Sequence, residues 1–332
     1  MNLKTLSSAL LVFFGGLVAH GSAEEPFSLS LPVDCEIGKT CFVQNYVDHD
    51  PGPGKQDFQC RAMTYDGHEG TDFRVLSLVE QRAGVPVLAV ADGVVLRIRD
   101  GEPDISFRSL GAQMVSGREC GNAIVIDHGN NWQTQYCHLA LNSVSVRPGQ
   151  KLKRGDPVGE IGLSGKTEFP HLHLSVRLNG KIVDPFAPLA EPGQCSKLTE
   201  SLWSPEIQAK LAYRNRVVLN KGFSDGPVQS NEIETGSVVR RSPTSESGAI
   251  VAYVRVIGLE AGDVQRLSLR HPDGTLLADN VAQPLTKPLA QQMLYVGYRK
   301  PGDGWIAGVY EASYIIERDG RKVSEDVFSF RF

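Results

Sequence analysis

The sequence predicts a mainly β protein with two folded domains, an antiparallel-sheet domain at residues 60–190 and an immunoglobulin-like β-sandwich at residues 215–332. Short segments of alternating polarity, separated by Gly turns, recur in both regions. Only one short stretch between them has the pattern of a helix start. The 332 residues also exceed what one hydrophobic core usually holds, so two domains are expected.

The strand candidates are short segments in which apolar and polar residues alternate. In the first domain they cover residues 85–90, 94–98, 123–127, 133–137 and 171–177. His128-Gly129-Asn130-Asn131 lies between two of them and indicates a hairpin turn. In the second domain they cover residues 249–257, 265–270, 292–298, 309–317 and 327–332, a spacing typical of an antiparallel sandwich.

The N-terminus has the pattern of an export signal. In residues 1–23, Lys4 precedes a mostly apolar run, and Gly21-Ser22-Ala23 forms a small-residue cleavage site before Glu24. The alternative, a single membrane anchor, is disfavoured because the apolar run is short and is broken by glycines. We therefore expect an exported protein, periplasmic or extracellular, that keeps no stable membrane anchor after cleavage.

Two further segments complete the predicted organisation. Residues 24–59 are rich in Pro and Gly and predict an N-terminal extension that is tied down by disulfides. Residues 191–214 predict a linker between the two domains. It contains one short helix, which starts at Pro205 behind Ser204 as the cap and runs to about residue 213.

Charge and cysteine content exclude some partners and indicate an oxidising compartment. The formal net charge of −4 gives no reason to expect binding to nucleic acid or to an anionic membrane surface. Six cysteines follow the cleavage site, and an even number in an exported chain suggests disulfides. Cys120 and Cys137 flank the hairpin turn almost symmetrically and predict one bridge. The other four would supply two more, and pairing Cys35 with Cys41 is a conjecture.

Six of the eight histidines lie within residues 49–173, which raises the expectation of a metal site in this region. The sharpest unit is His171-Leu172-His173. Side chains two positions apart in a strand point to the same face, so both imidazoles share one face while Leu172 enters the core. Alone, this pattern also fits a polar strand face that carries two histidines by chance.

Two more units carry groups that bind metals. His68-Glu69-Gly70-Thr71-Asp72 places a His and an Asp four residues apart, and Gly70 lets the backbone bend so that both can converge. Zinc accepts His nitrogen and Asp oxygen, and catalytic zinc sites use three protein ligands and a water. His138 ends the second strand of the hairpin, from where it could reach over the sheet. Alone, each unit also fits a surface loop or a surface histidine.

Together, in this order, these motifs resemble the lysostaphin-type (LytM-like) zinc endopeptidases, peptidase family M23, over about residues 64–188. The resemblance rests on residues 67–72, 84–93, 121–129, 136–139, 146–162, 170–173 and 184–185. It implies an antiparallel-sheet metallopeptidase domain that holds one zinc ion. Carried over by position, the zinc ligands are His68, Asp72 and His173, and the two catalytic histidines that do not bind zinc are His138 and His171.

The resemblance implies a zinc-dependent endopeptidase that hydrolyses peptide bonds in the stem-peptide cross-links of peptidoglycan. Zinc would lower the pKa of its bound water to about 7 and polarise the scissile carbonyl. His138 and His171 would serve as general base and as acid or oxyanion stabiliser, in an order that the sequence leaves open. Glu69 is an alternative base, although the helix and second His of H-E-x-x-H enzymes are absent.

The chain departs from the family's pattern in two places, and its extension raises a separate question. Residues 164–169 form a shorter loop than usual, and residues 100–119 resemble an insertion. Both would edge the substrate groove and affect the choice of cleavage site. Asn45, His49 and Asp50 in the extension could reach the open metal position and keep the enzyme latent. We favour the alternative, in which the extension is a structural wrap.

Other classes of protein remain as alternatives. The main one is a non-catalytic protein of the same fold that binds the cell wall or activates other hydrolases, which the five intact site residues disfavour. The D-Ala-D-Ala carboxypeptidases have a longer spacing between the first His and the Asp. Residues 149–156 resemble a turn of biotinyl carrier domains but lack a suitable lysine at the tip. For the C-terminal domain we favour a bracing role over binding to the wall or to a partner.

Overall fold

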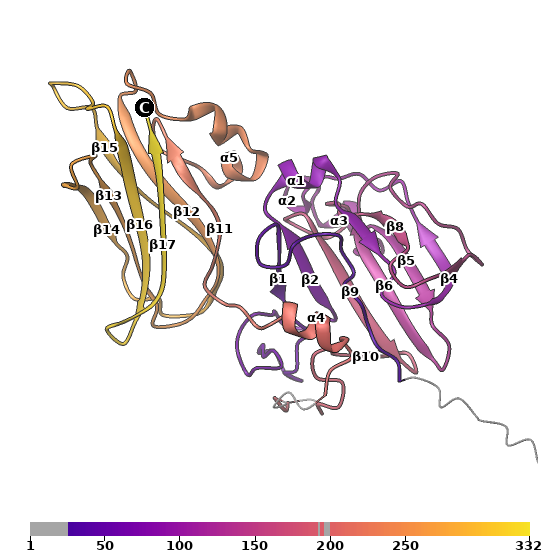
Figure 1. Cartoon of the computed structure of the whole chain (residues 1–332). Coiled ribbons are helices and arrows are strands. Elements are labelled where there is room, and N and C mark those ends of the chain that lie inside the picture. The colour runs from indigo at the N-terminus through magenta and orange to yellow at the C-terminus, as the bar shows by residue number, and fades with distance from the viewer. Residues whose placement is uncertain (1–25, 192, 196–199) are drawn as a thin grey trace, which may run out of the picture.

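The computed structural model describes residues 26–191, 193–195 and 200–332 (Figure 1). The predicted signal peptide therefore lies outside the described residues. Two groups of strands follow one another along the chain (Figure 1), and each contributes to its own hydrophobic cluster. Both groups form antiparallel sheets, which confirms the mainly β fold class. In the described part of the chain, no helix combines the length and the hydrophobicity needed to span a bilayer.

The first group of strands is built on an eight-stranded sheet. Its order is β1-β2-β9-β6-β5-β4-β7, and β10 also pairs with β9, while β3 and β8 form a separate small sheet. The strands are β1 (Cys41–Asn45), β2 (Thr71–Val75), β3 (Pro86–Leu88), β4 (Gly93–Arg99), β5 (Asn122–Asp127), β6 (Trp132–Leu139), β7 (Lys151–Leu152), β8 (Pro157–Glu160), β9 (His171–Leu178) and β10 (Lys181–Val183).

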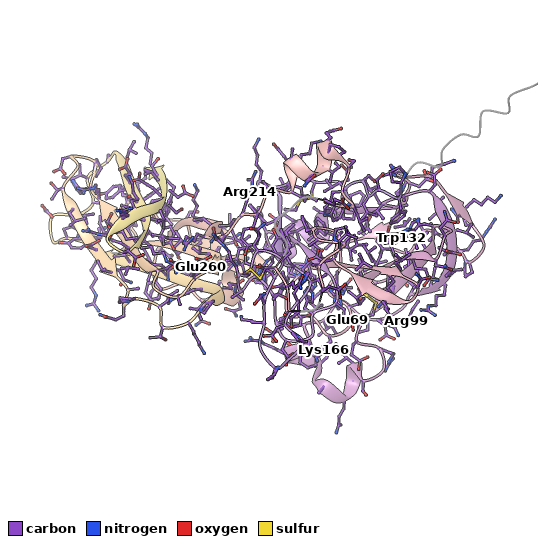
Figure 2. All side chains as sticks on the ribbon, turned by 90° about the horizontal axis from the view of Figure 1, so that it is seen from below. Glu69, Arg99, Trp132, Lys166, Arg214 and Glu260 are labelled. Atoms are coloured by element: carbon purple, nitrogen blue, oxygen red, sulfur yellow. A yellow bond between two sulfur atoms is a disulfide. The ribbon has the colours of Figure 1, made fainter. Side chains whose placement is uncertain are left out.

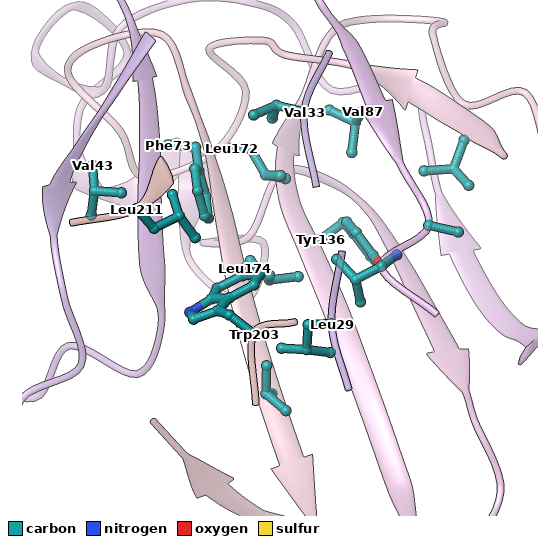
Figure 3. Packing of buried hydrophobic residues seen from close by; sticks show 14 of the residues in the cluster. Leu29, Val33, Val43, Phe73, Val87, Tyr136, Leu172, Leu174, Trp203 and Leu211 are labelled. Carbon is teal, nitrogen blue, oxygen red and sulfur yellow. The ribbon is translucent and has the colours of Figure 1, made fainter. Parts of the chain in front are cut away.

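Alternation along the central strands decides which side chains enter the core. Phe73, Leu172 and Leu174 are fully buried in one cluster with Leu29 and Trp203 (Figure 3). Burying a side chain of this kind stabilises the fold by about 1.5–3 kcal/mol. Successive residues of a strand point to opposite faces. The polar residues between these apolar ones therefore face away from the core, and they include the predicted metal ligands on β2 and β9.

The N-terminal extension contributes a strand that the sequence analysis missed. β1 pairs antiparallel with β2, with Cys41 opposite Val75 and Val43 opposite Phe73. The Pro- and Gly-rich composition of the extension as a whole hides this five-residue strand. The extension is thus continuous with the sheet that carries the site, and the predicted domain boundaries stay a prediction.

The cysteines form three disulfides, Cys35–Cys41, Cys60–Cys195 and Cys120–Cys137. The Cys120–Cys137 bridge confirms the main predicted pairing, and the Cys35–Cys41 conjecture is also correct. A loop of the size closed by Cys120–Cys137 is worth about 3 kcal/mol in the chain-entropy model. This bridge fixes β6 immediately before His138.

Several short helices connect the strands, whereas only one helix was expected from the sequence. The predicted helix begins at Pro205 as expected, but it ends before residue 213, and among the described residues the Ser204 side chain makes no capping bond. The predicted insertion at residues 100–119 carries two of the missed helices. The helices are α1 (Leu78–Ala83), α2 (Phe107–Leu110), α3 (Ala112–Val115), α4 (Pro205–Lys210), α5 (Ser230–Thr235) and the 3₁₀ helix η1 (Ser237–Arg241).

The C-terminal strands form two antiparallel sheets, β11-β12-β15 and β14-β13-β16-β17. Side chains from both sheets, such as Val254 and Tyr314, share one hydrophobic cluster. β11 and β14 were not among the strand candidates, and the immunoglobulin-like topology stays a prediction. The strands are β11 (Val217–Ser224), β12 (Ala249–Leu259), β13 (Val264–Arg270), β14 (Leu276–Val281), β15 (Leu289–Arg299), β16 (Val309–Arg318) and β17 (Arg321–Arg331).

The two groups of strands are in side-chain contact. Phe42 of β1 packs in one cluster with Leu219 and Ile257 of the C-terminal part. Arg61 donates to Glu260 across the same junction at 2.9 Å, and Figure 2 labels Glu260 where the two parts meet. β1, at one edge of the first sheet, therefore packs against the C-terminal part.

Candidate metal centre

Three predicted ligands meet at one point on β2 and β9. Asp72 on β2 lies directly opposite His173 on β9 in the strand register, and His68 precedes β2. Asp72 Oδ1 lies 2.9 Å from His173 Nδ1 and 3.1 Å from His68 Nε2. The two nitrogens are 3.0 Å apart. The structure thus brings together the His–Asp–His set that the sequence singled out, with His68 and Asp72 buried.

The geometry and chemistry of these donors fit a small metal ion. In a tetrahedral zinc site with bonds of about 2.0–2.1 Å, ligand atoms lie about 3.4 Å apart, slightly more than the separations here. The Nδ1 atom of His68 lies 2.7 Å from the Tyr46 carbonyl oxygen, which accepts its proton. The His68 Nε2 lone pair then faces the Asp72 carboxylate, another acceptor. Two acceptors at this distance require a cation or a proton between them, so the set suits a metal.

A second layer of contacts orients these donors. Ser175 Oγ lies 3.1 Å from His173 Nε2, and Asn45 Nδ2 donates to Asp72 Oδ2 at 2.8 Å. Partners of this kind set the tautomer and the ring orientation of metal-binding histidines. Ser175 was not among the candidate site residues from the sequence, although its position two residues after His173 places it on the same strand face. From the sequence, Asn45 was expected instead to reach the open metal position.

Gly70 is required at its position for a reason that differs from the one expected. Its φ is not among the positive values, so the left-handed region is not involved. A Cβ at residue 70 would lie 2.6 Å from His173 Nε2 and 2.7 Å from the Leu174 carbonyl oxygen. Glycine is therefore needed because β9 and the His173 ring approach the backbone closely.

His138 and His171 lie beside the three donors. Their ring centroids are 4.7 Å apart, and the centroids of His138 and His173 are 6.0 Å apart. His171 Nε2 lies 3.4 Å from Asp72 Oδ1. His138 reaches the site because its backbone has φ 63°, at a register irregularity between β5 and β6. Irregularities of this kind often re-aim a side chain next to an active site.

The loop at residues 164–169 holds both of these histidines. The Nδ1 atom of His138 donates to the Ser164 carbonyl at 2.8 Å, and Nδ1 of His171 donates to the Phe169 carbonyl at 2.9 Å. Each ring is thereby fixed in orientation, and its Nε2 is left available at the site. That this loop edges the substrate groove stays a prediction, and its backbone carbonyls orient the two imidazoles.

The charges at the site follow from burial and from the neighbouring groups. Burial, together with the imidazoles of His171 and His173, holds the pKa of His138 well below its usual value, so this ring is neutral at neutral pH. Burial would raise the pKa of Asp72, but the surrounding imidazoles, His68 first, hold it well below the usual value. Burial lowers the pKa of His68, but Asp72, the Tyr46 carbonyl and Asp48 together outweigh burial, and the net shift is upward. Asp72 is therefore a carboxylate.

None of the other described residues considered from the sequence occupies a donor position. Glu69 is 65% exposed and lies 3.8 Å from Arg177, which disfavours it as the base. His49 Nε2 pairs with Asp184 at 2.8 Å, and Asp50 accepts from the backbone of Gly52. Asn45 supports Asp72 rather than occupying a ligand position. The contacts of the extension therefore give no support to the latency hypothesis.

Three converging donors with two further histidines beside them form the arrangement expected of a metallopeptidase. Residues 66–185 match peptidase family M23. The chain therefore carries a domain of peptidase family M23 over these residues, and the family that the motifs indicated is confirmed.

Curated relatives share this region at about 30% identity. Peptidoglycan DD-endopeptidase ShyA of Vibrio cholerae is 33% identical over 117 residues, which are 35% of this chain and 22% of that protein. DD-carboxypeptidase/endopeptidase Mpg of Neisseria meningitidis is 29% identical over 167 residues, 49% of this chain and 33% of that protein. The chain thus spans a third or less of the length of these relatives. A solved structure, a zinc-containing peptidase from Vibrio cholerae, is 27% identical with a TM-score of 0.28, covering 44% of this chain and 39% of that one.

Proposed function

We propose that this chain is a zinc-dependent endopeptidase that hydrolyses peptide bonds in peptidoglycan. His68, Asp72 and His173 would hold one zinc ion, and His138 and His171 would carry proton transfers. The observation that carries the proposal is the convergence of three donor atoms within 3.1 Å of one another on β2, β9 and the segment before β2. The M23 domain and the peptidoglycan endopeptidases among its relatives support the choice of substrate.

Zinc bound here would lower the pKa of a water to about 7 and polarise the scissile carbonyl. The remaining steps belong to the two histidines. Each holds its Nδ1 proton on a backbone carbonyl, so its Nε2 can accept a proton from the attacking water or, once protonated, donate one. Since the rings come from β6 and β9, they approach the site from two different strands. One would act as base and the other would stabilise the oxyanion or protonate the leaving amine.

We place the protein outside the cytoplasm, in the periplasm or beyond the cell. Three disulfides support this location, because such bridges persist in oxidising compartments. The N-terminal export pattern agrees with it. Peptidoglycan is also reached from that side of the membrane.

The proposed function is tested by digesting purified peptidoglycan of defined composition with the zinc-loaded protein. Mass spectrometry of the released fragments should show new amino and carboxyl ends at a peptide bond, with intact glycan strands. The variant His171→Ala, which keeps all three proposed ligands, is the matched control and should release almost none. Zinc-loaded wild-type protein that releases no fragments would favour the non-catalytic alternative of the same fold.

A further inference from the structure

A buried ionic network joins the C-terminal part to the candidate site. Arg74 lies directly opposite His171 in the register of β2 and β9, so its side chain starts on the same sheet face as Asp72 and His173. Only 1% of Arg74 is exposed. Its guanidinium runs toward the C-terminal part, where it donates to Gln291 at 2.8 Å and lies 3.4 Å from Glu234 Oε2.

Glu234 of α5 is shared between two buried guanidinium groups. Its Oε2 atom also accepts from Arg255, which is 1% exposed. Arg255 in turn donates to the carbonyl of Leu76, at the end of β2, at 2.5 Å. One carboxylate of the C-terminal part therefore compensates two cations at the junction. Removing the Glu234 carboxylate would leave both guanidinium groups buried without this negative charge, an arrangement that proteins avoid.

The same guanidinium supports the residue that orients His171. The Arg74 Cζ atom lies 4.5 Å from the centroid of the Phe169 ring, within the range of a cation–π contact. The Phe169 ring in turn packs on the imidazole of His171, with centroids 4.5 Å apart and planes at 30°. The Phe169 carbonyl accepts the Nδ1 proton of His171. Phe169 therefore fixes both the plane and the tautomer of this imidazole.

We propose that Glu234 is a positioning residue for His171, acting through Arg74 and Phe169. The proposal rests on the proposed function, since His171 has its role there. The C-terminal part then completes the site instead of serving as a separate module. Because Glu234 touches neither the metal donors nor the two site histidines, its loss should leave zinc binding intact and disturb only the orientation of the imidazole.

The test compares Glu234→Gln with Arg61→Gln. The first removes the charge of Glu234 at constant shape, and the second breaks the Arg61–Glu260 contact across the same junction without touching Phe169. With a defined cross-linked muropeptide as substrate, Glu234→Gln should lower kcat about tenfold, less than the 10²–10⁴-fold typical of losing an acid or base. KM and zinc content should stay at wild-type values, and Arg61→Gln should match wild type throughout.

A double-mutant cycle distinguishes positioning from a general structural effect. If Glu234 acts through Phe169, Glu234→Gln should cost little further kcat in a Phe169→Leu background. Additive losses would overturn the proposal. Should Glu234→Gln not fold, Glu234→Asp keeps the charge at shorter reach and should show a smaller fall in kcat.

A spectroscopic measurement decides the inference independently of turnover. In zinc-loaded protein with ¹⁵N-labelled histidine, the ring nitrogen signals of His171 should shift in Glu234→Gln and in Phe169→Leu but not in Arg61→Gln. Unchanged His171 signals in folded Glu234→Gln would overturn the inference. If wild-type protein cleaves no muropeptide, the proposed function fails, while these signals still decide whether Glu234 positions the ring.

Discussion

Asp72 and His173 are directly paired across β2 and β9, and Asp72 Oδ1 lies 2.9 Å from His173 Nδ1. The register between β2 and β9 therefore determines the geometry of the site. A slip of one residue in this pairing would turn each side chain to the opposite face and separate the donors. The apolar residues on the other face, Phe73, Leu172 and Leu174, oppose such a slip because it would expose them.

Removal of a proposed ligand should remove the metal. His173→Ala deletes one of the three donors, so we expect the variant to lose its zinc and its hydrolytic activity together. Metal analysis of the purified protein measures the first effect. His128→Ala is the matched control, because His128 bonds the Asp92 carbonyl and Thr134 elsewhere in the first part. Stoichiometric zinc in His173→Ala would contradict the ligand assignment.

Replacing His138 or His171 should lower the hydrolytic activity without removing the metal. His138→Ala and His171→Ala keep all three donors, so each should retain one zinc while kcat falls about 10²–10⁴-fold. The double variant should fall less than the product of the two single effects, since the residues act as a unit. If either variant lost zinc while His68→Ala kept it, the roles of ligand and catalyst would have to be exchanged.

The hydrogen bond from Asn45 of the N-terminal extension to Asp72 should strengthen metal binding. Asn45→Ala removes the hydrogen bond to Asp72 Oδ2, and losing such a partner typically weakens metal binding about 10–100-fold. Competition with a chelator of known affinity measures this change. Asn280→Ala, which removes an exposed bond to the Tyr295 carbonyl, should leave zinc affinity unaltered. Tighter binding or a gain of activity in Asn45→Ala would revive the latency hypothesis.

No residue larger than glycine should fit at position 70 without a shift of its neighbours. Gly70→Ala would place a Cβ against the His173 ring and the backbone of Leu174 at under 3 Å, so β9 or the ring must shift. We expect weaker zinc binding and a lower melting temperature, both measurable by thermal unfolding with and without added zinc. Gly248→Ala is the control, since a Cβ there has no described atom within 4 Å. Wild-type behaviour of Gly70→Ala would show that the close approach is unimportant.

Local sequence patterns account for much of the site. The two-residue spacing of His171 and His173 predicted a shared strand face, and the structure shows it. The four-residue step from His68 to Asp72 brings both groups to one point, because β2 begins between them at Thr71. The Cys120–Cys137 bridge followed from the symmetry of the two cysteines about a hairpin turn.

Other parts of the site depend on contacts between residues far apart in the chain. Asn45 reaches Asp72 because a short strand from the Pro- and Gly-rich extension adds to the sheet edge, and composition hid that strand. Glu234 meets Arg74 only after the C-terminal part docks, 160 positions further along. No local spacing signals such a pair. The role of the 164–169 loop was also hidden, because it acts through backbone carbonyls that any sequence supplies.

Zinc-dependent peptide hydrolysis can be measured by digesting defined cross-linked muropeptides with wild-type protein, with zinc removed by a chelator and then restored. We expect that wild-type protein cleaves a peptide bond, that chelation abolishes the cleavage, and that one equivalent of zinc restores it. His171→Ala should stay nearly inactive with its zinc in place. Cleavage that survives complete removal of the metal, or fully zinc-loaded wild-type protein that leaves every peptide bond intact, would show that the protein is not a zinc-dependent endopeptidase.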